Sequence, residues 1–101
     1  MLKYKEVYLD GMGFDETDFI PCEISGDPAV DIHHIVNRED RIENLMALTR
    51  SNHTEYGDRK FCMAMLLRIH RRHLIGRKRK FNNDWFRKWI RHYEPYEIKT
   101  Q

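Results

Sequence analysis

The stretch that decides the fold, residues 30–58, reads VDIHHIVNREDRIENLMALTRSNHTEYGD. Over residues 30–36, apolar and polar side chains largely alternate, which is the period-two pattern of a strand with one buried face. Residues 37–43 are polar and charged, which indicates a loop, and the apolar run at 45–48 has the length of a second strand. These runs together predict a β-hairpin with a long loop.

A short helix is predicted to follow the hairpin. Thr49 or Ser51 can cap its first turn, because a side-chain hydroxyl accepts a free backbone N–H there, and Gly57 would end it. Asp58 is then the expected cap of a longer helix that reaches about Leu74. Its apolar stripe falls at helical spacing on Cys62, Met65, Leu66, Ile69 and His73.

Two more helices complete the predicted fold. One covers residues 3–12 and is ended by Gly11 or Gly13, although its Tyr and Val residues would also suit a strand. The other begins at Asn82 or Asn83 and ends before Pro95. The last helix places one aromatic and apolar stripe toward the core, with base stacking as the lesser alternative. That stripe consists of Trp85, Phe86, Trp89, Ile90 and Tyr93. Residues 1–101 are expected to form a single α+β domain.

Charge is distributed unevenly along the chain. The 18 basic and 16 acidic side chains leave a net charge of +2, but residues 1–58 carry −8 and residues 59–101 carry +10. A basic half indicates contact with nucleic-acid phosphate, although a solvated helical face is the alternative. The expected phosphate contacts are Arg50, Arg59, Lys60, Arg68, Arg71, Arg72, Arg77, Lys78, Arg79 and Lys80.

The hairpin also carries a pair of adjacent histidines. Neighbouring residues of a strand point to opposite faces, so His33 and His34 cannot easily bind the same metal ion. Imidazole serves either as a metal ligand or as a proton acceptor near neutral pH, and the pair therefore favours a division of roles. Three further histidines, His70, His73 and His92, are interpreted as structural or exposed, although each lies in the basic region.

The His33-His34 pair, followed by Asn44 and then His53, resembles the HNH nuclease motif, a ββα-metal (His-Me finger) module that hydrolyses nucleic-acid phosphodiesters. The resemblance implies that His33 and His53 bind a metal ion and that His34 is the general base. It assigns Asn44 to holding the loop and thereby positioning the base. Asp31 has three open roles: a partner that fixes a ring tautomer, a further ligand, or a solvent-facing strand residue.

The resemblance implies a ββα-metal core at about residues 21–57 and a basic helical extension at about 58–93. It implies a metal-dependent endonuclease that cuts DNA, most simply double-stranded, with Mg²⁺ or Mn²⁺ as the expected ion and Zn²⁺ or Ni²⁺ compatible with imidazole ligands. A non-catalytic nucleic-acid-binding module is the alternative, and a purely structural domain would leave motif and charge unexplained. Small HNH chains occur in phages and mobile elements, but nicking versus double-strand cleavage, target and oligomeric state stay open. No membrane-length segment or secretory signal is visible, so a cytoplasmic location is expected.

This chain departs from the family pattern at two places. Some relatives carry a third histidine where Gly57 stands here. Others bind a structural zinc through two CxxC pairs, at the positions of Cys22, Ser25, Thr49 and Asn52. Because three of these four residues are not cysteine, tetrahedral thiolate ligation is excluded. The last helix and the stripe around Met65 and Ile69 are the expected replacements that hold the fold.

Overall fold

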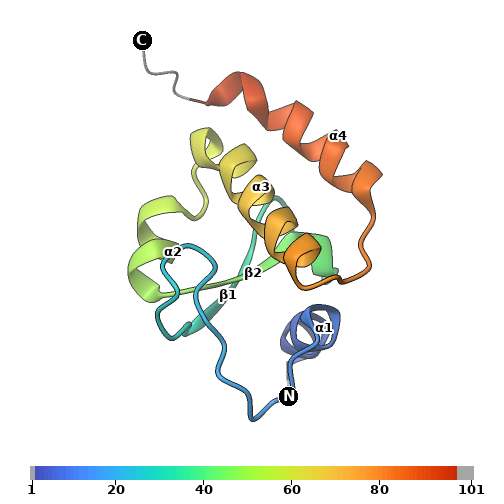
Figure 1. Ribbon diagram of the computed structural model, residues 1–101. Coiled ribbons are helices and arrows are strands. Elements are labelled where there is room, and N and C mark those ends of the chain that lie inside the picture. The colour runs from blue at the N-terminus through green and yellow to red at the C-terminus, as the bar shows by residue number, and fades with distance from the viewer. Residues whose placement is uncertain (1, 98–101) are drawn as a thin grey trace.

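A two-stranded antiparallel sheet lies at the centre of the computed structural model, which describes residues 2–97 (Figure 1). Strand β1 (Asp31–His34) pairs with β2 (Leu45–Leu48) in a register that sets His33 opposite Met46. β1 is shorter than the predicted run at 30–36, because the ladder stops beyond Ile35. From Ile35 onward, side-chain hydrogen bonds in the loop, rather than strand pairing, set the path of the chain.

Four helices surround this hairpin (Figure 1). They are α1 (Lys3–Met12), α2 (Arg50–Tyr56), α3 (Lys60–Gly76) and α4 (Asn83–Tyr93), with short 3₁₀ turns η1 (Ile42–Asn44) and η2 (Glu94–Tyr96). α3 packs against α4 on one side and η1 on another, α1 packs against both strands, and α2 contacts the strands and α3. The predicted α+β class is thereby confirmed. Within residues 2–97, no helix is both long enough and apolar enough to span a bilayer.

Local capping signals located two helix starts correctly and a third wrongly. The Thr49 hydroxyl accepts the backbone N–H of Asn52 at 3.1 Å to begin α2, and the Asn82 side chain caps α4. The prediction that Asp58 caps α3 is wrong, because α3 begins after Arg59 without a side-chain cap. Asp58 instead has φ of 61°, a left-handed conformation that reverses the chain between α2 and α3.

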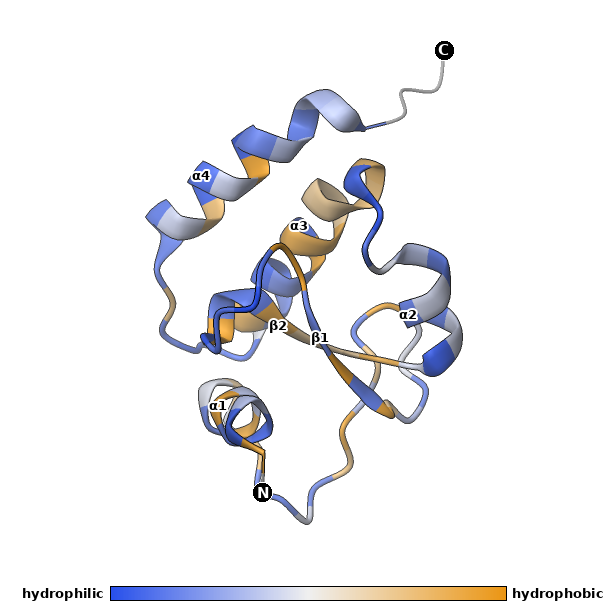
Figure 2. Cartoon of the chain, turned by 180° about the vertical axis from the view of Figure 1, so that it is seen from behind, coloured by the Kyte–Doolittle hydropathy of each residue, from blue (hydrophilic) through white to orange (hydrophobic). Residues whose placement is uncertain are grey.

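The buried face of α3 also differs from the predicted stripe. Ala64, Leu66, Leu67, His70 and Leu74 are fully buried, whereas Met65, Ile69 and His73 are only partly buried. The reason is that α3 lies between the hairpin and α4, so two of its faces are covered rather than one. Figure 2 shows the apolar colour concentrated in α3 and the hairpin, with α2 and α4 mainly hydrophilic.

A buried polar network joins three elements of the core. The Tyr8 hydroxyl donates to Glu23 Oε2 at 2.7 Å, and His70 Nδ1 lies 2.8 Å from Glu23 Oε1. His70 Nε2 donates to the Ile42 carbonyl oxygen, and a carbonyl can only accept. Since both ring nitrogens face acceptors, His70 is an imidazolium paired with the carboxylate of Glu23. His70 is therefore structural and wholly buried, one of the two roles expected for it.

This network predicts that stability falls in mildly alkaline solution. Burial alone would lower the pKa of His70, but the charge of Glu23 and the hydrogen bonds outweigh it, so the pKa is raised above 6.5. A raised pKa contributes stability that is fully present below about 6.5 and is lost as pH rises through the folded-state value. We expect the free energy of unfolding, measured by urea denaturation, to decline between pH 6 and pH 9, and a His70→Gln variant to lose that slope. An equal slope in both proteins would contradict the ion pair.

The segment after α3 fastens α1 to the body of the protein. Arg77 Nε donates to the Met12 carbonyl at 2.7 Å, and Arg79 Nε donates to the Gly11 carbonyl at 2.9 Å. The Arg77 guanidinium also lies 3.9 Å from the centroid of the Phe14 ring. Cations are favourable at the carboxyl end of a helix, where carbonyls are unpaired. We call this pair of contacts, from Arg77 and Arg79, the arginine clasp.

Candidate functional site

The three histidines of the motif line one cavity. This cavity, of about 550 Å³, opens between the hairpin, the loop after β1 and the turn that leads into α3. His33 and His34 reach it from β1, and His53 reaches it from α2. The strand and the helix are separated in sequence, but they bring their histidines to the same place in space, as the motif requires.

The rings of His33 and His53 lie next to each other at the cavity. Their centroids are 4.6 Å apart, with the ring planes tilted by 54°. Two imidazoles bound to one ion through nitrogens at about 2.1 Å have centroids roughly 4.5–5.3 Å apart. His33 Nε2 is buried and has no hydrogen-bond partner within residues 2–97. Burial and the neighbouring His53 lower the pKa of His33 to about 4, so the ring is neutral at pH 7 and retains a free lone pair.

Asp31 fixes the orientation of His53. His53 Nδ1 lies 3.0 Å from Asp31 Oδ2, and Arg50 donates to both Asp31 oxygens at 2.7 and 2.9 Å. Hydrogen bonds from Arg50 and then from His53 lower the pKa of Asp31 to about 2, so the carboxylate is ionised and accepts. His53 Nδ1 therefore carries the hydrogen, and its Nε2 keeps a lone pair for a metal. Of the three roles left open for Asp31, the geometry matches that of a tautomer-fixing partner.

Asp40, in the loop after β1, holds the ring of His34 in place. His34 Nε2 lies 2.8 Å from Asp40 Oδ1, and the His34 side chain is 28% exposed. Since a carboxylate accepts, Nε2 carries the hydrogen and Nδ1 is the free acceptor. The Tyr4 ring packs edge-on against His34 with centroids 5.3 Å apart, which limits rotation of the imidazole. Sequence reasoning missed Asp40, because nothing in the spacing indicates that the loop folds back onto β1.

The side chain of Asn44 holds that loop in place through hydrogen bonds. It is fully buried, and its side-chain oxygen accepts the backbone N–H of Val36 at 3.0 Å. Its amide nitrogen donates to the carbonyls of Asn37 and Glu39 at 2.9 and 3.0 Å. Asn44 therefore spans both ends of the segment that leads from His34 toward Asp40, and it acts as a positioning residue rather than as a group that reacts.

Gly57 leaves no room for a side chain between the rings of His53 and His33. A Cβ atom there would lie 2.5 Å from the His53 carbonyl oxygen, 2.7 Å from His53 Cδ2 and 3.3 Å from His33 Cε1. A third histidine at this position is therefore sterically excluded in this chain. The next residue, Asp58, is exposed and lines the same cavity, and sequence reasoning had assigned it only a capping role.

Gly57→Ala is expected to destabilise the protein by about 1–3 kcal/mol, because the added methyl group overpacks the site. It should also weaken metal binding, since the collision falls on both rings. Gly76→Ala is the matched control: no atom lies within 4 Å of its added Cβ, and the change should be neutral or stabilising by about 0.4–1 kcal/mol. Thermal melts and metal titration calorimetry measure both effects. Equal stability of the two variants would contradict the crowding.

The imidazoles of His33 and His53 are the side chains that could donate to a metal ion. Within the part of the chain that the structure describes, no group of three or more histidine, cysteine or acidic side chains is arranged as a metal site. The unpaired Nε2 of His33 and the free Nε2 of His53 nevertheless fit a divalent ion that takes its other ligands from water, from substrate phosphate, or from the nearby Asp58.

Hydrogen bonds connect Cys22 and Asn52, which occupy two of the positions where the HNH resemblance would place zinc-binding cysteines. Cys22 Sγ donates to Asn52 Oδ1 at 3.2 Å, and Asn52 is tied in turn to Thr49 at the start of α2. The adjacent Glu23 belongs to the buried network with His70. These contacts hold the segment against α2 and α3, beside the packing residues that the sequence had suggested.

Several predicted phosphate contacts are engaged within the chain. Arg77 and Arg79 form the arginine clasp, and Arg68 pairs with Glu94 and Glu97 at 2.9 and 2.8 Å. Lys60 Nζ lies 5.2 Å from the centroid of Tyr96, and Arg71 reaches Asn83 at 3.5 Å. In the described range, four others are exposed without an ion pair: Arg59, Arg72, Lys78 and Lys80. Arg38, which sequence reasoning omitted, lines the cavity itself.

Comparisons of this chain with protein-family models, with curated proteins and with solved structures found no match. The class of protein is therefore inferred from the residues and their geometry. Two features define it: a hairpin followed by a short helix, and a cavity where two imidazoles face each other beside a third that is held by a carboxylate.

Proposed function

We propose that this chain is a metal-dependent HNH endonuclease, with a ββα-metal core, that hydrolyses DNA phosphodiester bonds. The observation that carries the proposal is the unpaired, buried Nε2 of His33. The His33 residue lines a cavity together with His34 and His53, and the rings of His33 and His53 lie 4.6 Å apart between centroids. A merely structural histidine would have found a hydrogen-bond partner, because an unpaired buried polar atom costs stability.

His33 and His53 would hold the metal through their Nε2 atoms. When bound, a divalent ion supplies a Lewis acid for the charge that develops on the phosphate and on the leaving oxygen. Asp31 keeps the His53 ring oriented, and Arg50 keeps Asp31 ionised. Arg38, at the edge of the cavity, is placed to bind the phosphate that flanks the scissile bond.

His34 supplies the general base. Its Nδ1 takes a proton from a water molecule, the water oxygen attacks phosphorus in line, and the bond from phosphorus to the 3′ oxygen breaks, with the leaving oxygen taking a proton from solvent water. The products are a 5′-phosphate and a 3′-hydroxyl. Asp40 stabilises the imidazolium that forms, and Asn44 keeps the loop that carries Asp40 in place. The His34–Asp40 pair favours hydrolysis over a pure binding role, since binding alone needs no oriented proton acceptor.

A plasmid-nicking assay tests the proposal. Supercoiled plasmid is incubated with the protein and Mg²⁺, Mn²⁺, Zn²⁺ or Ni²⁺, with and without EDTA. We expect nicked product that EDTA suppresses, carrying ends that DNA ligase reseals because they are 5′-phosphate and 3′-hydroxyl. DNA binding without cleavage in every metal would instead favour the non-catalytic module. Cleavage that is indifferent to EDTA would overturn the metal site.

A further inference from the structure

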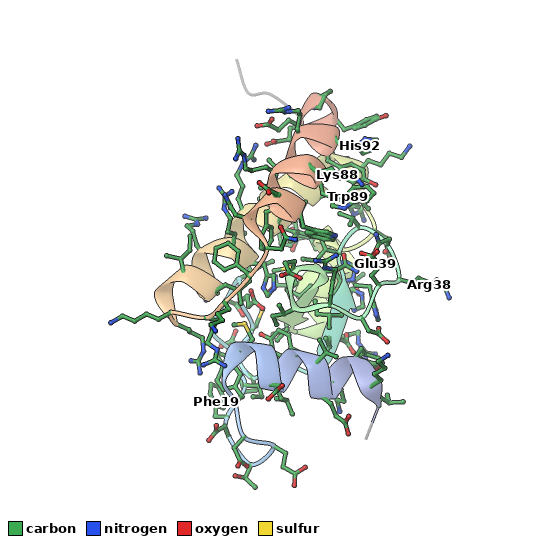
Figure 3. The ribbon with its side chains drawn as sticks, turned by 90° about the vertical axis from the view of Figure 1, so that its right-hand side faces the viewer. Phe19, Arg38, Glu39, Lys88, Trp89 and His92 are labelled. Carbon is green, nitrogen blue, oxygen red and sulfur yellow. The ribbon has the colours of Figure 1, made fainter. Side chains whose placement is uncertain are left out.

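One face of α4 presents aromatic and cationic side chains beside the cavity. Trp85, Lys88, Trp89 and His92 are spaced at i, i+3, i+4 and i+7, which places them on the same side of a helix. Trp85 is buried, Trp89 is partly exposed, and Lys88 and His92 are exposed. Figure 3 shows Lys88, Trp89 and His92 along one side of the molecule, with Glu39 and Arg38 next to them. We call Arg38, Lys88, Trp89 and His92 the α4 face.

The α4 face is connected to the cavity through the loop after β1. Trp85 Nε1 donates to Glu39 Oε2 at 3.3 Å, and the Arg41 guanidinium lies 5.3 Å from the Trp85 ring centroid. Glu39 directly follows Arg38, which lines the cavity. The loop that lines the cavity is therefore joined to the first turn of α4. The carboxylate of Glu39 lies on this route, but Trp85 and Arg41 engage it.

Trp89 is stacked on a second ring and flanked by the Lys88 ammonium and the His92 ring. Tyr93 stacks on it with centroids 6.1 Å apart and ring planes 19° from parallel. Lys88 Nζ lies 5.1 Å from the Trp89 centroid, and His92 packs edge-on at 5.6 Å. Over residues 2–97, Arg38, Lys88 and His92 make neither an ion pair nor a side-chain hydrogen bond. Basic side chains without an ion pair, beside a partly exposed aromatic ring, are a combination that suits single-stranded nucleic acid.

We propose that the α4 face binds an unpaired DNA strand as it leaves the cavity, with phosphates at Arg38 and Lys88 and a base stacked on Trp89. Bases in a duplex are already stacked on their neighbours, so a partly exposed aromatic ring favours a strand without a complement. The role of the cavity in this inference rests on the proposed nuclease function. The preferred substrate is then DNA with a single-stranded segment beside the scissile phosphate.

Binding measured in EDTA isolates the α4 face from cleavage. A fluorescein-labelled 15-nucleotide single strand and the matching blunt duplex are titrated with the full chain and followed by anisotropy. Trp89→Leu keeps apolar packing but removes the stacking ring, and it should weaken single-strand binding about tenfold while changing duplex binding less than about twofold. Lys88→Gln should weaken single-strand binding and flatten its salt dependence. Phe19→Leu is the matched control, because Phe19 is 61% exposed but lies away from the α4 face (Figure 3).

Tryptophan emission gives a second readout. Single-stranded DNA should quench the wild-type protein, and the quenching should disappear in Trp89→Leu, where only the buried Trp85 remains. Thermal melts establish that the variant is folded; if it is not, Lys88→Gln together with wild-type quenching decides. Unchanged single-strand affinity in the folded variants, or equal losses for strand and duplex, would overturn the inference. Concentration-dependent dimerisation that Trp89→Leu abolishes would also overturn it, since a second copy would then cover the face.

The outcome for the α4 face is separable from the outcome for the nuclease. If no metal supports cleavage but single-strand binding depends on Trp89, the proposed function fails and the binding surface stands. If cleavage occurs but Trp89→Leu binds single strands as wild type does, the binding surface fails and the nuclease stands.

Discussion

His34→Ala is expected to lower the rate of plasmid nicking by about 10²–10⁴-fold, while the protein still folds and binds DNA. The alanine removes the proton acceptor that Asp40 orients and leaves the His33 and His53 rings in place. His34 is partly exposed, so its loss costs little packing. Nicking rates, circular dichroism and DNA binding in EDTA measure the three properties separately.

Variants of Asp40 distinguish a positioned base from a residue that only holds the fold. Asp40→Ala should reduce nicking, and Asp40→Asn should restore part of it, because an amide oxygen still accepts from His34 Nε2 at the same place. Asp27→Asn, an exposed change in the turn before β1, should behave as wild type. Undiminished nicking by His34→Ala would show that another group activates the water and would remove His34 from the mechanism.

Glu23→Ala is expected to lower the free energy of unfolding by about 3–5 kcal/mol, the usual result of removing one partner of a buried ion pair. Three groups lose their acceptor at once: the imidazolium of His70, the Tyr8 hydroxyl and the Ala47 backbone N–H. Because domains of this size are stable by only about 5–15 kcal/mol, the variant should be close to unfolding at body temperature. Urea denaturation monitored by circular dichroism gives the value.

Graded substitutions separate charge from shape at this position. Glu23→Gln keeps an acceptor for Tyr8 but leaves His70 without its counter-charge, so its loss should lie between those of wild type and Glu23→Ala. Tyr8→Phe removes a single hydrogen bond and should cost about 1 kcal/mol. Glu16→Ala, at an exposed position, should stay within about 0.5 kcal/mol of wild type. A Glu23→Ala protein as stable as Glu16→Ala would refute the buried pair.

Local sequence patterns predicted the helices and strands. Tertiary contacts determined the buried face of α3 and the turn at Asp58. The hairpin, the helix starts at Thr49 and Asn82 and the α+β class follow from alternation and capping, which depend on neighbours in sequence. The buried face of α3 depends on how α4 and the hairpin cover it, so a single-stripe reading chose Met65 and Ile69 over Ala64 and Leu67. Asp58 has the composition of a cap but occupies a left-handed turn, which only the crossing of α2 and α3 demands.

The candidate site was predictable where it repeats a motif and hidden where the chain folds back. The convergence of His33, His34 and His53 was expected, and the structure brings all three to one cavity. Asp40 was missed because its contact with His34 depends on the loop that Asn44 shapes. Asp31 was expected beside His33, its neighbour on the strand face, but α2 brings His53 to it instead.

The arginine clasp orders the assembly of the protein during synthesis. α1 precedes the hairpin and α3 in the sequence, yet the guanidinium groups that hold its carboxyl end belong to the segment that follows α3. The ring of Tyr4, which packs against the imidazole of His34, belongs to that helix. A nascent chain in which Arg77 and Arg79 have not yet been synthesised lacks this contact, so the packing of Tyr4 on His34 is secured only after α3 has been made.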